Sequence, residues 1–87
     1  MSENRRPSAE IQRRLATNVK QLREARNYTQ QELARRCGLN KGYVSKIEQE
    51  LMYISLASLE ALAQGLNCLE TDLLMPIRLP PDPSDPT

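Results

Sequence analysis

The 87-residue sequence has no histidine, tryptophan or phenylalanine, and it has only three tyrosines and two cysteines. Without histidine, and without a CxxC pair, the usual ligand sets of a zinc site cannot be assembled. Cys37 and Cys68 are far apart in the sequence, and we interpret both as small core residues in a reducing cytoplasm rather than as a disulfide. The apolar runs are short and the N-terminus has no hydrophobic signal core, so we expect neither secretion nor a membrane span.

An enzyme is the class of protein that these absences argue against most strongly. The sequence offers no phosphate-binding glycine loop, no activated cysteine context and no paired carboxylates in a plausible cleft. We therefore predict no catalytic residue, no metal, no cofactor and no small-molecule ligand.

What the sequence does have is a regular supply of Leu, Ala, Glu, Gln and Arg, which favour helices over strands. An apolar content of 39% in 87 residues allows one modest core. The fold class predicted is therefore all-α, as one compact bundle.

Charge is divided unevenly along the chain, although the net charge is only +1. Residues 1–46 carry eleven Lys and Arg against four acids, a net charge of +7, whereas residues 47–87 carry one Arg against seven acids, a net charge of −6. Such a split is typical of a protein that places one surface against a polyanion, and the alternative is scattered solvated charge.

The first predicted helix covers residues 9–26, with Ser8 as its N-cap and Asn27 ending it in a left-handed conformation. Its apolar face consists of Ile11, Leu15, Val19 and Leu22. Residues 1–8 form a predicted flexible basic arm.

The second helix is predicted over residues 30–37, where Thr29 and Glu32 form a capping box. Gly38 follows at a position that favours a positive φ. Ala34 is small at the point where this helix must meet the next one.

The third helix is predicted from Lys41 to about Gln49, with Asn40 as its N-cap. Val44 and Ile47 face inward, three residues apart. The outward positions are Lys41, Gly42, Ser45 and Lys46. Two short helices joined by a three-residue turn form a helix-turn-helix, and the free face of the third helix, a rod about 10–12 Å across, fits a DNA major groove.

Two further helices complete the predicted domain of residues 9–75. Ser55 caps a helix over residues 56–66, which Asn67 ends, and residues 70–75 form a short fifth helix. The buried positions predicted for the fourth helix are Leu59, Leu62, Ala63 and Leu66. Residues 76–87 are rich in proline and are predicted to be an extended or disordered tail.

The segments LREARNYTQQELARRCGLNKGYVSKIE and SLASLEALAQGLN resemble the Cro and phage-repressor (XRE-type) helix-turn-helix family in order and spacing, from about Leu15 to Leu74. The resemblance implies a five-helix, lambda-repressor-like fold and a homodimer that binds a two-fold operator in double-stranded DNA. Half-sites would lie about 34 Å apart.

Carried over by position, the resemblance also implies roles for residues in the second and third helices. Base contacts fall on Asn40, Lys41, Gly42 and Lys46. Gln30 matches a position where side chain and amide meet a phosphate. Tyr43 and Ser45 contact the DNA backbone, with packing as the alternative for Tyr43.

Several arginines have predicted structural or phosphate-binding roles, of which only that of Arg23 follows from the resemblance. Arg23 and Glu48 match a partly buried ion pair between the first and third helices. Arg35 and Arg36 reach phosphates or else form a solvated face. Arg5 and Arg6 are candidates for an arm across the DNA backbone.

The loop after the third helix departs from the family pattern. The family commonly has glycine, then basic residues and proline, whereas this chain has Glu50 followed by four apolar residues. We expect Leu51, Met52 and Ile54 to pack on the core or in a dimer interface rather than on DNA. The interface predicted with them contains Leu69, Leu73 and Ile77.

The predicted function is that of a sequence-specific transcriptional regulator, most simply a repressor acting as a homodimer on a palindromic operator. We expect it in the prokaryotic cytoplasm, associated with the nucleoid, in a plasmid or phage type of context. The alternative is an antitoxin or adaptor that uses the same fold to bind another protein, which the apolar loop and the Leu- and Pro-rich C-terminus motivate.

Overall fold

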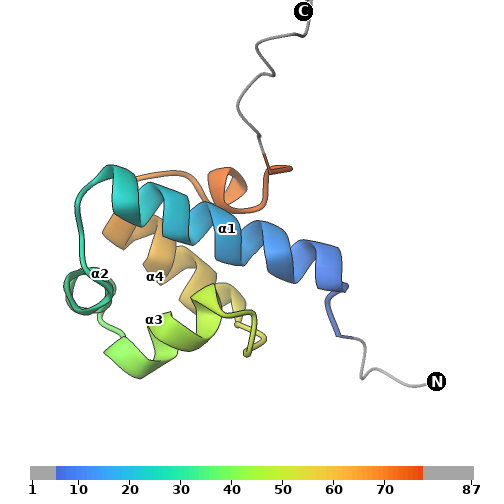
Figure 1. The fold of residues 1–87 in the computed structure, drawn as a ribbon, viewed down its shortest axis with the longest axis horizontal. Coiled ribbons are helices and arrows are strands. Elements are labelled where there is room, and N and C mark those ends of the chain that lie inside the picture. Colours follow the sequence, from blue (N-terminus) through green and yellow to red (C-terminus); the bar gives the residue numbers. More distant parts are fainter. Residues whose placement is uncertain (1–5, 78–87) are drawn as a thin grey trace, which may run out of the picture.

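The computed structural model describes residues 6–77 of the chain. Its elements are α1 (Ala9–Ala25), α2 (Gln30–Cys37), α3 (Lys41–Glu48), α4 (Leu56–Leu66) and the 3₁₀ helix η1 (Glu70–Leu73) (Figure 1). The all-α class is confirmed for these residues. The predicted number of five α-helices is wrong, because the last element is a single 3₁₀ turn of four residues, closed by short-range bonds and soon followed by Pro76. Most of the predicted arm and the tail from residue 78 lie outside the described residues.

Each α-helix begins at a residue whose side-chain oxygen accepts a backbone N–H three residues later. The pairs and N···O distances are Ser8 with Ile11 (3.2 Å), Thr29 with Glu32 (3.0 Å), Asn40 with Tyr43 (2.7 Å) and Ser55 with Ser58 (3.1 Å). The four predicted caps are thus confirmed. The reciprocal half of the predicted capping box is not formed, because the Glu32 carboxylate pairs with Arg35 and Arg36 instead.

Every α-helix is also followed by a residue with a positive φ, which terminates the helix. These residues are Asn27 (58°), Gly38 (70°), Glu50 (62°) and Asn67 (54°). At each end, one N–H bonds three residues back and the next N–H bonds five residues back, which satisfies the last carbonyls of the helix. As a result α1 ends at Ala25 and α3 at Glu48, one residue earlier than predicted.

The core lies between α1, α2, α3 and α4, with η1 packed against α1 and α4. Its buried apolar residues are Leu15, Ala16, Val19, Leu33, Ala34, Val44, Ile47, Leu59, Leu62, Ala63, Leu66 and Leu73. The predicted dimer contact through Leu73 is wrong, because this side chain is fully buried within its own chain. None of the described helices has the length and apolar character that a membrane crossing requires.

Close contact between α2 and α4 depends on Gly65. A Cβ at this position would lie 2.3 Å from Cys37 Sγ and 3.2 Å from the Cys37 backbone nitrogen. Because only hydrogen fits there, α4 can support the end of α2 directly behind the turn that leads to α3.

Candidate nucleic-acid interface

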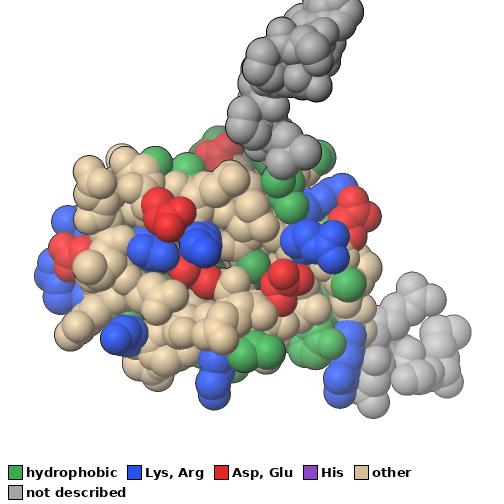
Figure 2. Space-filling model, viewed as in Figure 1, with side chains coloured by type: hydrophobic (Ala, Val, Ile, Leu, Met, Phe, Trp, Pro, Cys, Tyr) green, Lys and Arg blue, Asp and Glu red, His purple; other side chains and the backbone are tan. Residues whose placement is uncertain are grey.

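The outer face of α3 is exposed and its inner face is fully anchored. Val44 and Ile47 are 0% and 2% exposed, while Asn40 and the other predicted base-contact positions are exposed, namely Lys41, Gly42 and Lys46. Figure 1 places α3 at the lower edge of the described domain, with its inner side packed against α1 and α2. In the space-filling view, Lys and Arg groups line this lower edge, and the Asp and Glu groups visible on the same face lie above it (Figure 2).

The start of α3 is electrostatically different from the starts of α1 and α2. Those two helices have Glu10 and Glu32 in their first turns, whereas α3 has no acid there and begins with Lys41. A cation beside the positive end of a helix is unfavourable by about 0.3–1 kcal/mol. Neither Lys41 nor Lys46 forms an ion pair with another described residue. This end of α3 therefore presents only positive charge, which favours an anionic partner.

Asn40 combines the N-cap with a position on the exposed face. Its Oδ1 accepts the Tyr43 N–H at 2.7 Å, which holds the carboxamide in one orientation. The Nδ2 group is then the part of the side chain that remains available as a donor to a base edge.

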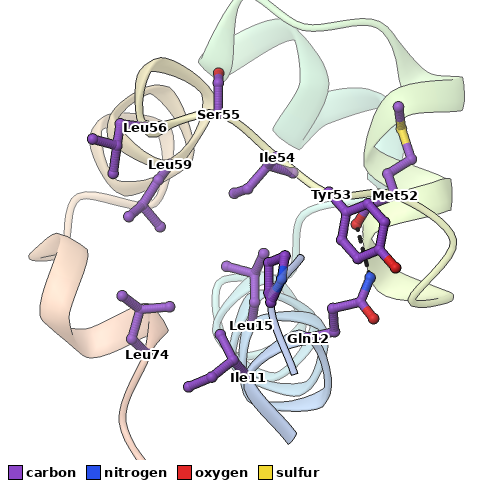
Figure 3. Close-up of a pocket in the computed structure, with 11 residues that line it drawn as sticks. Ile11, Gln12, Leu15, Met52, Tyr53, Ile54, Ser55, Leu56, Leu59 and Leu74 are labelled. Carbon is purple, nitrogen blue, oxygen red and sulfur yellow. Dashed lines mark hydrogen bonds between the residues drawn. The ribbon is translucent and has the colours of Figure 1, made fainter. Parts of the chain in front are cut away.

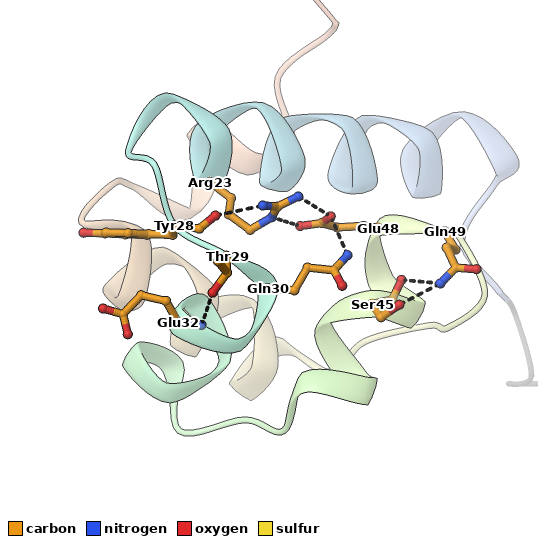
Figure 4. A network of polar contacts seen from close by, with 8 residues as sticks. All are labelled: Arg23, Tyr28, Thr29, Gln30, Glu32, Ser45, Glu48 and Gln49. Carbon is orange, nitrogen blue, oxygen red and sulfur yellow. Dashed lines mark hydrogen bonds and ion pairs between the residues drawn. The ribbon is translucent and has the colours of Figure 1, made fainter.

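Tyr43 and Ser45 are each half-buried and hydrogen-bonded within the protein. The Tyr43 hydroxyl donates to Ser58 Oγ at 3.0 Å, and its ring packs against the core. The structure thus gives Tyr43 the packing role that was the alternative to a DNA contact. Ser45 Oγ accepts from Gln49 Nε2 at 2.7 Å (Figure 4).

A polar network joins the ends of α1, α2 and α3 behind this face (Figure 4). Arg23 forms a bidentate pair with Glu48, with Nε to Oε2 at 2.7 Å and Nη2 to Oε1 at 3.1 Å. The side chains are 12% and 4% exposed, respectively. Arg23 Nη1 also donates to the Tyr28 carbonyl at 2.8 Å. The hydrogen bond and charge of Glu48 raise the pKa of Arg23 despite burial, so Arg23 stays charged. The bidentate pair fixes α3 relative to α1.

Gln30, the predicted phosphate-binding residue, belongs to the same network. Its Nε2 donates to Glu48 Oε1 at 3.0 Å, and the residue is half-buried at the start of α2. One of the two Nε2 hydrogens is used in this contact, which leaves the second hydrogen as a donor in a fixed orientation.

Arg35 and Arg36 are held on the surface of α2. Both pair with Glu32, at 2.6 Å for Arg35 and 3.4 Å for Arg36. The Arg36 guanidinium also lies 4.3 Å from the centre of the Tyr28 ring. All of these contacts are with Glu32 of α2 or with Tyr28 just before α2.

The loop after α3 lines an apolar groove of about 170 Å³, which we call the loop groove (Figure 3). Its walls are formed by α1, the loop, the start of α4 and the chain after η1. The lining residues are Pro7, Ile11, Gln12, Leu15, Met52, Tyr53, Ile54, Ser55, Leu56, Leu59 and Leu74. Ile54 packs on the core as expected, whereas Leu51 is 66% exposed. Tyr53 and Leu56 could not be identified as groove residues from sequence, because only the fold brings them beside α1.

The remaining chemistry of the described residues is limited. Cys37 and Cys68 are free thiols packed against the core, and burial raises the pKa of both, which keeps them protonated at neutral pH. Within residues 6–77, no three His, Cys, Asp or Glu side chains come together in a way that suits a metal ion. Arg5, part of the predicted arm, lies outside the described residues.

Comparison with known proteins agrees with this geometry. The helix-turn-helix family model HTH_3 matches residues 19–74, which include α2, α3 and α4. A protein of Neisseria meningitidis serogroup B described as a hypothetical transcription factor is 39% identical over 62 residues, 71% of this chain. The chain spans 58% of that relative's length. The control protein C.SmaI of Serratia marcescens is 34% identical over 65 residues, covering 75% of this chain and 77% of that protein.

Solved structures give the same result. The crystal structure of the hypothetical transcription factor NHTF from Neisseria superposes with a TM-score of 0.75 at 32% identity, covering 87% of this chain and 88% of that one. The restriction-modification controller protein C.AhdI from Aeromonas hydrophila superposes with a TM-score of 0.69 at 27% identity, covering 71% and 94%. The chain therefore belongs to the XRE-type helix-turn-helix family of DNA-binding transcriptional regulators.

Proposed function

We propose that this protein is a sequence-specific regulator that binds a palindromic operator as a homodimer and acts as a repressor. The observation that carries the proposal is α3 itself, a short helix anchored from behind by two buried aliphatic side chains and positively charged on its free face. In this arrangement α3 enters the major groove and each protomer reads one half-site. Transcription is repressed because the bound dimer occludes polymerase.

Base recognition is assigned to the exposed face of α3. Lys41 and Lys46 donate to guanine O6 or N7, and Asn40 donates through Nδ2. Gly42 allows close approach of the backbone. Since the helix offers only these few polar groups, part of the specificity comes from DNA shape.

Phosphate contacts come from the surroundings of α3. One phosphate is bound by the free Nε2 hydrogen of Gln30 and by the exposed N–H groups at the start of α2. Glu48 holds the Gln30 side chain in position for this contact. Ser45, Arg35 and Arg36 are further candidates, and the arginines must exchange their contacts with Glu32 for DNA.

A homodimer requires an apolar surface that a second copy can cover. Leu56 and Leu69 are 84% and 66% exposed, and Leu56 borders the loop groove beside Leu74. We propose that these residues, together with Ile77, form the interface. Leu56→Lys or Leu69→Lys is expected to shift the protein to monomer in analytical ultracentrifugation and to weaken operator binding. Gln64→Lys, which adds the same charge to α4 outside the groove, is the control, and an unchanged dimer in both leucine variants would contradict this interface.

Selection of bound fragments from random DNA, followed by footprinting, tests the function as a whole. The expected result is an enriched palindrome with half-sites about one helical turn apart, protected by nanomolar protein and released steeply by salt. Enrichment of no sequence, or affinity without salt dependence, would refute the proposal.

The matched controller proteins favour one narrower function. Because C.AhdI is described as a restriction-modification controller protein and C.SmaI as a control protein, we propose that restriction-modification genes are among the targets. Promoter fragments of such genes from the source organism are expected to compete with the selected operator at equal concentration. Competition no better than that of random DNA would exclude these targets while leaving the general function intact.

A further inference from the structure

Two residues of the N-terminal arm, Arg6 and Pro7, and one residue of α1, Gln12, contact the loop after α3. The Arg6 guanidinium lies 5.3 Å from the centre of the Tyr53 ring, within the range of a cation–π interaction. Pro7 lines the loop groove together with Tyr53, and Gln12 Nε2 donates to the Met52 carbonyl at 3.4 Å (Figure 3). These contacts come from consecutive parts of the arm and α1, so they fix where the arm leaves the domain.

The same loop has no cation of its own. Glu50 is the only charged residue among residues 50–54, and its side chain is exposed. The loop starts directly after α3, whose eight residues measure about 12 Å. If the start of α3 is in a major groove about 12 Å wide, the loop is close to the phosphates at the groove edge. An acid and apolar side chains in this place leave those phosphates without a positive partner from the loop.

We infer that Tyr53 is a positioning residue that holds Arg6 beside the loop, so that the arm supplies the phosphate contact that the loop lacks. The inference rests on the proposed function. A cation–π contact uses the positive charge of the guanidinium and needs no N–H hydrogen bond to the ring, so the N–H groups remain available for phosphate oxygens. A side chain that is already positioned also loses less conformational freedom on binding.

Operator binding of the full chain at several salt concentrations tests this inference. Arg6→Ala is expected to reduce the slope of log K against log salt by about one per protomer, which corresponds to roughly eightfold weaker binding per protomer at 0.1 M salt. The matched control is Arg14→Ala, which removes an α1 arginine already paired with Glu10 at 2.9 Å. Equal slopes for wild type and Arg6→Ala, or an equal loss in Arg14→Ala, would overturn the inference.

The role of Tyr53 is tested by coupling. Tyr53→Leu keeps an apolar side chain in the groove and removes the ring face, whereas Tyr53→Phe keeps the ring. The effect of Arg6→Ala on affinity is expected to be about two- to fivefold smaller in Tyr53→Leu than in wild type or Tyr53→Phe. An equal effect in all three backgrounds would show that Tyr53 does not position the arginine.

A measurement without DNA separates this inference from the proposed function. In NMR spectra of the free protein, the Arg6 side-chain protons are expected to show ring-current shifts that persist in Tyr53→Phe and disappear in Tyr53→Leu. If the wild type selects no DNA, the proposed function fails and the phosphate role with it. If the wild type binds its operator and the Arg6 shifts are absent, only the present inference fails.

Discussion

Among the four residues with a positive φ that end the helices, Glu50 is the least suited to this conformation. Replacing it with glycine is expected to stabilise the protein. Its φ is 62°, and the other three left-handed residues are Gly38, Asn27 and Asn67, which tolerate this conformation better. A residue with a Cβ is strained by about 1–2 kcal/mol in this conformation. Glycine relieves the strain, but it also raises the entropy of the unfolded chain, which lowers the free energy of unfolding by about 0.5–1 kcal/mol. The net gain expected for Glu50→Gly is about 0.5–1 kcal/mol, or about 2–8 °C in Tm for a domain of this size.

Calorimetry and urea titration measure this gain, and two controls separate backbone strain from charge. Glu50→Ala removes the same carboxylate from the C-terminal end of α3 and keeps the Cβ, so its gain is expected to stay at a few tenths of a kcal/mol. Asn67→Gly tests a position where the native residue already accepts a positive φ, and its gain is also expected to be small. Backbone strain at position 50 is excluded if alanine stabilises the protein as much as glycine does, or if glycine lowers Tm.

Three further variants test the packing and the polarity of the site. Glu48→Ala leaves Arg23 largely buried without its partner, so the free energy of unfolding in urea is expected to fall by about 3 kcal/mol. Adding Arg23→Met is expected to recover part of this loss. A loss below about 1 kcal/mol would show that the pair is not structural. Gly65→Ala places a Cβ against Cys37 and is expected to lower the free energy of unfolding by about 1–3 kcal/mol. The loss is expected to be smaller when Cys37→Ala removes the sulfur atom. An unchanged Tm would contradict the close contact. Lys41→Glu is expected to raise the free energy of unfolding by up to about 1 kcal/mol, because an acid is favourable at the positive end of the helix dipole. The same change is expected to abolish operator binding. A change of stability and affinity in the same direction would argue against the site.

Much of the fold could be predicted because its signals are local. Ser8, Thr29, Asn40 and Ser55 each act on an N–H only three residues away, so sequence spacing is enough to find the helix starts. The periodic apolar residues likewise predicted the core faces of α1, α3 and α4.

The predictions that failed depend either on contacts between distant residues or on a choice between two local partners. Leu73 has the same apolar character as Leu69, and only its position under α1 and α4 distinguishes a core residue from a surface one. Glu32 had two available partners, the N–H of Thr29 or the arginines one turn later, and the spacing allows both. Nothing in the sequence shows that Tyr53 lies beside Arg6, because they are separated by three helices.

The most direct test of the account compares the removal of two positive charges from α3 with the removal of two from α1. Lys41→Ala with Lys46→Ala is expected to weaken operator binding at least about a hundredfold in fluorescence anisotropy, with an unchanged circular dichroism spectrum. Arg13→Ala with Lys20→Ala, which makes the same change in net charge on exposed positions of α1, is expected to weaken binding by less than about threefold. Equal affinities for the two double variants would contradict the claim that the free face of α3 reads DNA, and retained regulation by the α3 variant would instead favour a protein partner.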